Sequence, residues 1–446
     1  MDSTANVLCL LEGFGGSIQP SPIGRCNQRV TILWWYRSMR NETRLTESRM
    51  RKRRILTKLL ILIGSVFVSL LIVEVALRII GFRYLNLYQD DPHLGFAHRP
   101  GAEGWWRIEG ETYIKINSEG LRDRQHSKVK PPNTVRVAVL GDSFAEALQV
   151  PMENAFWAVA EQKLAACKAF RDRKVEVMNF GVSGFSTARE LIMLRQRVWD
   201  YSPDIVVLVV TTRNDIRDNS RLLNPEYGRL PLPYFVYKNG DLILDDSVLK
   251  ARNESLRFRL RTSFVGRYLD WFSNHLRLIG LINQARVVFQ NLGEKRKQRP
   301  ISFGYEQGLE DKVFMEPPDA AWNEAWQITE GLMLLMRNEV EAHGAKFLIV
   351  TGSTGIQVYP NQEARRTYMR ALGVDNLFYA ENRIAAWGAR EEIQVLALAP
   401  TLQNYADEKG VFLHGPDGFG HWNVVGHRVV GEQVAEKLCE IAATTN

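Results

Sequence analysis

The sequence predicts an α/β protein with a doubly wound parallel sheet, preceded by one N-terminal transmembrane helix. Three observations lead to this prediction. Short, almost entirely apolar runs recur along the chain, as in parallel strands that are covered on both faces. Helical apolar patterns separate these runs. A charge-free apolar run follows a cluster of basic residues near the N-terminus.

The candidate strands are four to six residues long and nearly all apolar. They are Val135–Leu140, Val175–Phe180, Ile205–Val210, Phe347–Val350 and Ile393–Leu398.

Helical patterns fill the intervals between the strands. After the first strand, Phe156, Ala160, Leu164 and Cys167 share one helix face. After the second strand, Thr187 and Glu190 have the spacing of a capping box at a helix start. Two further helices are expected over Ala320–Glu341 and Asn423–Ile441.

The apolar run near the N-terminus predicts a membrane anchor. Leu59 to Val73 carries no charge, and Leu59 to Leu77 reaches the length of about 20 residues that a bilayer requires. A buried soluble helix and a cleaved signal peptide are the alternatives, but no small-x-small cleavage site follows Val73. Basic residues before the run place the N-terminus in the cytoplasm and the body in the periplasm or outside the cell.

This pattern divides the chain into a cytoplasmic leader (1–54), an anchor (55–80), a linker with a small β region (81–133) and an α/β domain (134–446). Residues 1–49 show no clear periodicity. Met50 opens the basic cluster and is a candidate for the first residue of the native protein. Alternatively, residues 1–49 are present and form a disordered leader.

An insertion at about 220–315 interrupts the α/β pattern. It begins with a hairpin signal that turns at Asn239-Gly240. It continues over 256–289 with a helical, basic and aromatic stretch. Such a stretch is either a helical lid packed on the domain or a segment that rests on a membrane surface.

The charge distribution argues against nucleic-acid binding. The net charge is +7, but residues 1–58 hold 11 Lys/Arg and 4 Asp/Glu, which accounts for all of it. The rest of the chain is neutral and offers no long-range field to a phosphate backbone. The sequence also has no CxxC or Cys/His cluster, so we expect no metal and no cofactor.

Polar residues follow the first three predicted strands, where ligands bind in open α/β sheets. Gly141-Asp142-Ser143 follows the first strand, and Ser143 is either a nucleophile or an ordinary helix cap. Gly184 lies in a loop after the second strand, and Asn214 follows the third. Each also fits a plain turn.

A fourth polar block precedes the last predicted helix. His421 lies in it with Asp417 close by, and His414 is a second candidate base. His427 is expected to pack or cap, and Asp142 and Asp215 to brace turns.

These four blocks resemble the SGNH branch of the GDSL-type hydrolases, which is named for Ser, Gly, Asn and His in successive blocks. Ser143, Gly184, Asn214 and His421 follow this order, and the resemblance covers about 135–442 apart from the insertion. The chain departs from the family in two places. Thr212-Arg213 stands before Asn214 where the family usually has glycine, and Asp417 lies four rather than three residues before His421.

The resemblance implies a serine esterase with the SGNH hydrolase fold. His421 would be the base for Ser143, and Asp417 would orient His421. The backbone N–H groups of Ser143 and Gly184 and the Asn214 side chain would form the oxyanion hole.

The substrate would be an acyl or acetyl ester of a lipid, a glycan or a small molecule. One alternative is an O-acyltransferase that uses the same site on an envelope polysaccharide. Another is a non-catalytic module that binds such a polysaccharide.

The predicted fold also suggests that two cysteines lie close together. In a sheet of flavodoxin-like order, the first and last helices pack on the same face, and Cys167 and Cys439 lie near their C-terminal ends. An extracytoplasmic compartment would allow a disulfide between them, and two buried free thiols are the alternative.

Overall fold

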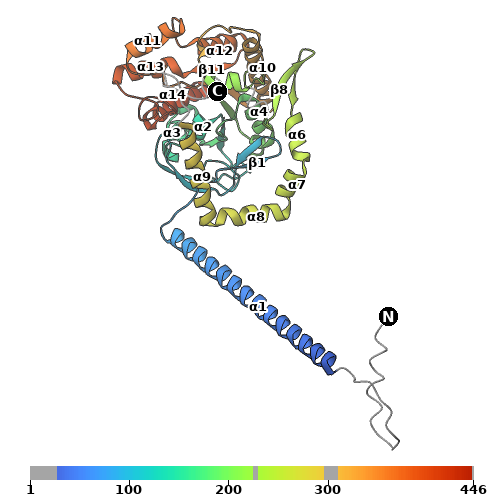
Figure 1. Ribbon diagram of the computed structural model, residues 1–446. Coiled ribbons are helices and arrows are strands. Elements are labelled where there is room, and N and C mark those ends of the chain that lie inside the picture. Colours follow the sequence, from blue (N-terminus) through green and yellow to red (C-terminus); the bar gives the residue numbers. More distant parts are fainter. Residues whose placement is uncertain (1–27, 225–229, 296–309, 444–446) are drawn as a thin grey trace, which may run out of the picture. The chain divides into compact units, whose positions relative to one another are not determined.

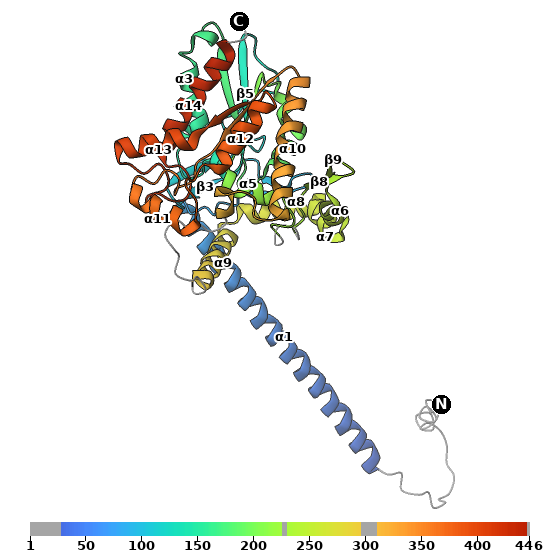
Figure 2. The same cartoon turned by 90° about the horizontal axis from the view of Figure 1, so that it is seen from above.

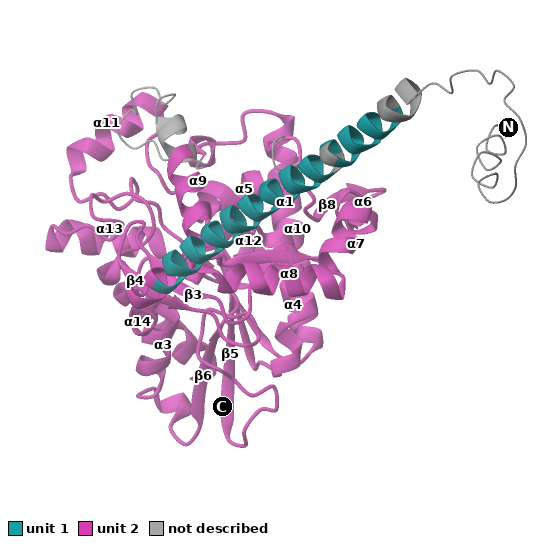
Figure 3. Ribbon diagram, turned by 60° about the horizontal axis from the view of Figure 1, so that its bottom comes forward, with its two compact units in different colours: residues 1–75 teal, residues 76–446 magenta. Residues whose placement is uncertain are grey.

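The structure is a computed structural model that describes residues 28–224, 230–295 and 310–443. It comprises two compact units, residues 1–75 and residues 76–446, coloured separately in Figure 3. The first 27 residues of the predicted leader lie outside the described residues. So do residues 225–229 and 296–309 of the predicted insertion.

Helix α1 (Gln28–Ile79) forms the described part of unit 1 and ends in unit 2. Among the described residues it is the one helix long and apolar enough to cross a membrane, over Trp34–Ile79. Its apolar side chains from Ile55 to Val73 are exposed.

The core of unit 2 is a five-stranded parallel sheet, as predicted. Its order β11-β10-β7-β5-β6 corresponds to 5-4-3-1-2 along the chain, which is the flavodoxin-like order. The strands are β5 (Thr134–Leu140), β6 (Lys174–Asn179), β7 (Ile205–Val210), β10 (Lys346–Thr351) and β11 (Gln394–Ala397).

Helices cover both faces of this sheet because successive side chains of a buried strand point to opposite faces. Val135, Val137 and Val139 of β5 face one core, and Ala138 and Leu140 face the other. The first core is closed by α3 (Phe156–Leu164), α13 (Leu398–Lys409) and α14 (Val424–Ala443). The second is closed by α4 (Thr187–Gln196), α10 (Ala320–Ala342) and α12 (Tyr379–Arg390). Figure 2 shows α3 and α14 on one side of β5 and α10 on the other.

In the described part of the chain, three hairpins lie outside the main sheet. Strands β1 (Tyr88–Asp91) and β2 (Gly95–His98) pair, as do β3 (Glu103–Trp106) and β4 (Thr112–Lys115), in the predicted small β region. In the insertion, β8 (Tyr234–Lys238) pairs with β9 (Asp241–Asp245). Asn239 and Gly240 turn this hairpin with φ of 54° and 91°, as the Asn-Gly signal predicted.

The remaining described α-helices lie around the sheet (Figure 1). They are α2 (Ser143–Glu146), α5 (Thr212–Asp218), α6 (Ser247–Glu254), α7 (Leu256–Thr262), α8 (Phe264–His275), α9 (Arg277–Lys295) and α11 (Gln362–Leu372).

The predicted capping box is wrong. Ser186, not Thr187, precedes the first turn of α4, and the Thr187 hydroxyl and both Glu190 carboxyl oxygens have no hydrogen-bond partner among the described residues. Both side chains are fully buried. The hydrophobic face of α4, rather than a side-chain cap, therefore fixes this helix on the sheet.

The disulfide between Cys167 and Cys439 is present, with a Cα–Cα distance of 6.0 Å. Cys167 lies just beyond the C-terminal end of α3, and Cys439 lies in α14. Helices α3 and α14 pack along each other over the first core, which brings the two sulfur atoms together.

Candidate active site

The site lies at the carboxyl edge of the sheet, where β5 ends and α2 begins. Strand β5 leads through Gly141-Asp142 into Ser143, the first residue of α2. Gly141 is required because a Cβ atom there would lie 2.8 Å from the side chain of Ala145. The tight turn leaves the Ser143 side chain only partly buried, at the end of a strand whose other residues are buried.

His421 meets Ser143 across this edge. The loop 414–423 enters α14, and it places His421 Nε2 2.7 Å from Ser143 Oγ. The imidazole packs on the ring of Phe144, with 4.9 Å between centroids. Phe144 itself is buried, so it provides a rigid surface against which the imidazole is held.

The acid that contacts His421 is Glu109 and not Asp417. Glu109 Oε2 lies 2.8 Å from His421 Nδ1 and also accepts the backbone N–H of His421 at 2.7 Å. Asp417 is directed elsewhere, and its Oδ1 accepts the backbone N–H of Phe419 at 3.3 Å. The expected role of Asp417 is therefore corrected: its carboxylate closes a turn within its own loop.

The backbone is shaped around the Glu109 carboxylate. Glu109 has a φ of 61°, a left-handed conformation that is uncommon for residues other than glycine. Gly420, with a φ of 82°, faces it, and a Cβ atom on Gly420 would lie 2.5 to 2.6 Å from the carboxylate atoms. A strained residue whose carboxylate fits against a bare glycine is typical of a functional site.

The electrostatics of the pair favour a charged carboxylate beside a basic imidazole. Burial alone would raise the pKa of Glu109, but its hydrogen bonds and attraction to His421 outweigh burial and lower that pKa below its ordinary value. Burial alone would lower the pKa of His421, but Glu109 outweighs burial and raises it above 6.5. Glu109 therefore strengthens His421 as a base.

The other two histidines of this region are structural. His414 is buried, contacts the Gly420 carbonyl at 2.7 Å and Ser353 Oγ at 3.0 Å, and burial lowers its pKa to about 4. His427 is buried and accepts the backbone N–H of Phe156 at 3.2 Å. His414 is therefore not brought to Ser143 as an alternative base, and His427 packs as expected.

Asn214 contacts Asp142 rather than Ser143 or His421. Its Nδ2 donates to Asp142 Oδ2 at 3.1 Å, while Asp142 Oδ1 accepts the Phe144 N–H at 2.9 Å and the Thr211 hydroxyl at 3.1 Å. Asp142 thus caps α2 and orients the Asn214 amide at the same time. Asp215 accepts the Thr211 N–H at 2.7 Å, which also braces this turn.

The Gly184 loop is held in place by a buried carboxylate, Glu146. Glu146 accepts the Ser183 N–H at 2.9 Å, and it also contacts the Ser183 hydroxyl, Tyr88 and His98. Burial would raise the pKa of Glu146, but His98 and the other partners outweigh burial and lower it, so this carboxylate is ionised. Gly184 follows with a φ of 73°. Within the described chain, no hydrogen bond occupies the backbone N–H of Gly184 or of Ser143.

A small cavity of about 40 Å³ opens beside Ser143 and His421. Trp106, Ile108 and Leu148 provide its apolar wall, and Gln149 and Ser183 provide polar groups. Trp106 is the last residue of β3, and Ile108 comes from the loop that also carries Glu109. The β3–β4 hairpin therefore supplies both the acid and one wall of the site.

No family model and no curated protein matches the chain. Solved structures similar to it include the acetyl xylan esterase AlAXEase, at 12% identity and a TM-score of 0.34, which covers 68% of this chain and 99% of that one. A catalytic mutant of Axe2, an acetylxylan esterase from Geobacillus stearothermophilus, shares 11% identity (TM-score 0.34, 70% and 96% covered). TesA shares 15% (TM-score 0.31, 68% and 97% covered).

The geometry of the chain itself is the basis for its likeness to a family. That geometry has two parts. The sheet has the flavodoxin-like order, and Ser143, Gly184, Asn214 and His421 all lie in segments that follow its strands or precede its last helix. In fold and in the placement of these four blocks, the chain resembles the SGNH/GDSL-type hydrolases.

Proposed function

We propose that this protein is a serine ester hydrolase that cleaves esters of short acyl groups through a covalent acyl-serine. The observation that carries the proposal is the continuous chain of contacts from Ser143 Oγ through both ring nitrogens of His421 to Glu109. A serine hydroxyl is a weak nucleophile unless a base takes its proton, and the base acts best when a third group orients it.

The contacts of His421 suit one tautomer. With Glu109 ionised, His421 Nδ1 carries the hydrogen that Glu109 accepts, and the Nε2 lone pair faces the Ser143 hydroxyl. Oγ attacks the acyl carbon while its proton moves to Nε2, and the carbonyl π electrons move onto the oxygen. The tetrahedral intermediate then releases the alcohol, which takes the proton from Nε2 as it leaves. Water repeats the sequence on the acyl-serine and frees the acid.

The oxyanion would be held by groups that are already oriented. The backbone N–H groups of Ser143 and Gly184 are candidate donors. The Asn214 side-chain amide is a third candidate, because one of its two N–H bonds points to Asp142 and the other is available. Preorganised donors of this kind stabilise the charge that develops on the carbonyl oxygen.

The cavity supports an acetyl-sized acyl group. Its volume of about 40 Å³ is that of a few water molecules, and the bulky side chains of Trp106, Ile108 and Leu148 limit its length. We therefore place the acyl group in this cavity and the alcohol of the ester, from a lipid, a glycan or a small molecule, outside it.

We also propose that the enzyme is a single-pass membrane protein with its N-terminus in the cytoplasm and unit 2 outside it. The basic cluster before the apolar run supports this orientation. The disulfide in unit 2 supports it independently, because such bonds persist in oxidising compartments and are rare in the cytosol.

The test uses the full chain in detergent and a fluorophosphonate, which traps activated serines. We expect labelling at Ser143, located by peptide mapping, and loss of labelling in Ser143→Ala and His421→Ala. A series of aryl esters from acetate to octanoate should show the highest kcat/KM for acetate. Folded protein that does not label would contradict the proposed nucleophile, and a preference for octanoate would contradict the acyl size.

A further inference from the structure

The insertion carries a surface of exposed apolar side chains that the proposed chemistry does not use. It lies on helices α7, α8 and α9, which follow one another around one end of unit 2 (Figure 1). No residue of α7 or α8 is buried. The most exposed of these side chains are Phe264 at 78%, Phe289 at 73% and Leu256 at 71%. Apolar side chains gathered in this number mark an interaction site.

The same stretch is strongly basic. Residues 256–289 contain six arginines and one carboxylate, Asp270, whereas the chain beyond residue 58 is neutral as a whole. Tyr268 and Trp271 are more than half exposed among these arginines. Arginine beside exposed aromatic and aliphatic side chains is the composition of helices that lie in the interface of a membrane. We call residues 256–289 the arginine–aromatic surface.

Contacts tie this surface to the end of helix α1. Arg78 Nη2 donates to the His275 carbonyl at 2.9 Å, and Asn86 Nδ2 donates to Asn274 Oδ1 at 2.7 Å. Gly280 of α9 lies against Tyr84, so closely that a Cβ atom on it would be 2.8 Å from the Tyr84 Cβ. Arg78 directly follows the apolar run that ends at Leu77, so the junction of α8 and α9 is held at the end of the proposed membrane span.

A hollow of about 490 Å³ lies at this junction, between the chain that leaves α1 and helices α8 and α9. Five arginines line it, with two carboxylates, Glu103 and Asp270. Glu103 pairs with Arg83 and Asp270 with Arg99. The excess of positive charge suits a phosphate group, and Trp271 on the same wall suits the boundary between headgroups and acyl chains.

We propose that the arginine–aromatic surface docks unit 2 on an anionic phospholipid leaflet, with a lipid phosphate received in the hollow. The proposal rests on the proposed role of α1 as a membrane anchor and is independent of the esterase chemistry. A leaflet is favoured over a protein partner because the surface begins where the chain leaves the bilayer and carries the charge opposite to anionic lipids. Anchor and surface together would hold the domain against the membrane instead of on a free tether.

The experiment uses the full chain in nanodiscs of phosphatidylcholine and phosphatidylglycerol. A photoactivatable benzophenone amino acid replaces one phenylalanine at a time: Phe264 of α8, Phe289 of α9, Phe67 of α1 or Phe412, which is 36% exposed and outside the surface. We expect phospholipid adducts by mass spectrometry at Phe264, Phe289 and Phe67, and none at Phe412.

The outcomes separate the proposals. Adducts at Phe67 without adducts at Phe264 and Phe289 overturn the docking surface and leave the anchor intact. A lack of adducts at Phe67 overturns the anchor and the docking surface with it. Adducts to protein at Phe264 overturn the choice of lipid as partner. None of these results depends on esterase activity, which is assayed on the same samples.

The charge of the surface is tested with Arg267→Gln, which removes one guanidinium from the wall of the hollow. With the probe at Phe264, one turn away on α8, we expect the ratio of phosphatidylglycerol to phosphatidylcholine adducts to fall about five-fold. Arg390→Gln, on the exposed end of α12, is the matched control and should leave the ratio unchanged. An unchanged ratio in Arg267→Gln would contradict the phosphate site.

Discussion

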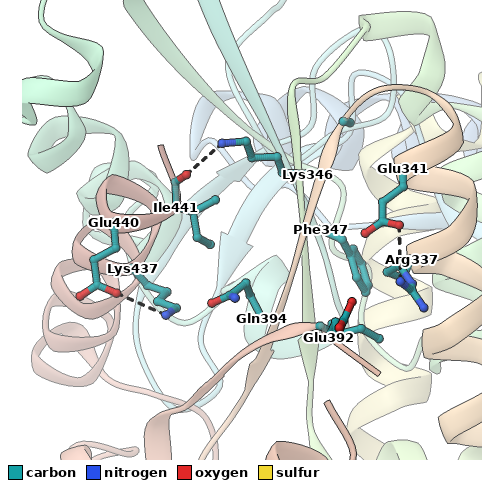
Figure 4. Close-up of a pocket in the computed structure, with 11 residues that line it drawn as sticks. Arg337, Glu341, Lys346, Phe347, Glu392, Gln394, Lys437, Glu440 and Ile441 are labelled. Atoms are coloured by element: carbon teal, nitrogen blue, oxygen red, sulfur yellow. Dashed lines mark hydrogen bonds and ion pairs between the residues drawn. The ribbon is translucent and has the colours of Figure 1, made fainter. Parts of the chain in front are cut away.

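The two edges of the parallel sheet each have a hollow. The larger hollow is at the amino edge, but the candidate catalytic residues line the smaller one at the carboxyl edge. At the amino edge, a hollow of about 370 Å³ lies beside the first residues of β10 and β11 (Figure 4). Two ion pairs line it, Lys437 with Glu440 at 3.3 Å and Arg337 with Glu341 at 3.5 Å. Lys346 Nζ donates to the Ile441 carbonyl at 2.9 Å. The carboxyl edge has a cavity of only about 40 Å³, beside Ser143 and His421.

The difference shows that the size of a hollow is a poor guide to a catalytic site. At the amino edge, each ion pair lies within a single helix, and no pair joins a base to a nucleophile. At the carboxyl edge, Glu109 raises the pKa of His421, and His421 contacts a hydroxyl that is otherwise unreactive. We therefore expect the amino edge to serve stability and the carboxyl edge to serve chemistry.

The largest effect is expected from the nucleophile and its base. Ser143→Ala or His421→Ala should each lower kcat for aryl acetates by about a million-fold, because neither group acts without the other. Gln394→Ala, an exposed change at the amino edge, should stay within about two-fold of wild type. Steady-state kinetics on folded protein measures both. A large loss in Gln394→Ala would break the division between the edges.

The next largest effect is expected from Glu109. Glu109→Gln keeps the size of the side chain but removes the charge that fixes the His421 tautomer, and it should lower kcat about 10,000-fold. The matched control is Asp417→Asn, which should retain nearly full activity because Asp417 does not contact His421. The reverse ranking of these two variants would restore Asp417 as the acid.

The pH dependence sharpens the same assignment. His421 must be neutral to accept the serine proton, so kcat/KM should fall as the pH drops through the pKa of His421. Because Glu109 raises that pKa, the midpoint of this acid limb should lie above 6.5. In Glu109→Gln the midpoint should move to lower pH, since burial then acts on the imidazole without the opposing charge. A midpoint that does not move would show that Glu109 does not set the basicity of His421.

A smaller loss is expected from Gly420→Ala. The new methyl group would overlap the Glu109 carboxylate and displace it, and a shift of about 1 Å in such a group can cost about 100-fold in kcat. Gly373→Ala is the control, because Gly373 has a similar φ of 71° and open space around its Cβ position. Equal losses in the two variants would show that backbone strain, and not contact with Glu109, causes the effect.

The smallest effect on catalysis is expected from the disulfide. Replacing Cys167 and Cys439 with serine should lower the free energy of unfolding by about 2–5 kcal/mol, since the bond closes a loop of 272 residues. The kcat at temperatures where the variant is folded should remain near wild type, because Cys439 lies beside the amino-edge residues Glu440 and Ile441. Denaturant unfolding and activity are compared on the same preparation.

Much of the fold could be predicted from the sequence because its signals are local. Ile205–Val210 is a strand at the expected residues because six buried apolar side chains in succession suit a strand covered on both faces. The Asn239-Gly240 turn is equally local, since both residues tolerate positive φ. The capping box at Thr187 failed because burial of the whole first turn of α4 outweighed a preference that belongs to solvent-exposed helix ends.

The site was only partly predictable, for a related reason. Ser143 and His421 lie in segments that strand order brings to one edge, so the four blocks were enough to name them. Glu109 lies 312 residues before His421, in a hairpin loop outside the sheet, and no periodicity connects the two. Its one local signal is a conformation, the φ of 61°, which is visible only in the structure.

The sequence distance between Glu109 and His421 has a consequence for biosynthesis. The chain is made from its N-terminus, so the acid emerges early and the base only with the last helix. Until His421 has been made and its loop has settled against Gly420 and Glu109, Ser143 has no activating partner. If the proposed chemistry holds, the growing chain would have no esterase activity until its last helix has been made.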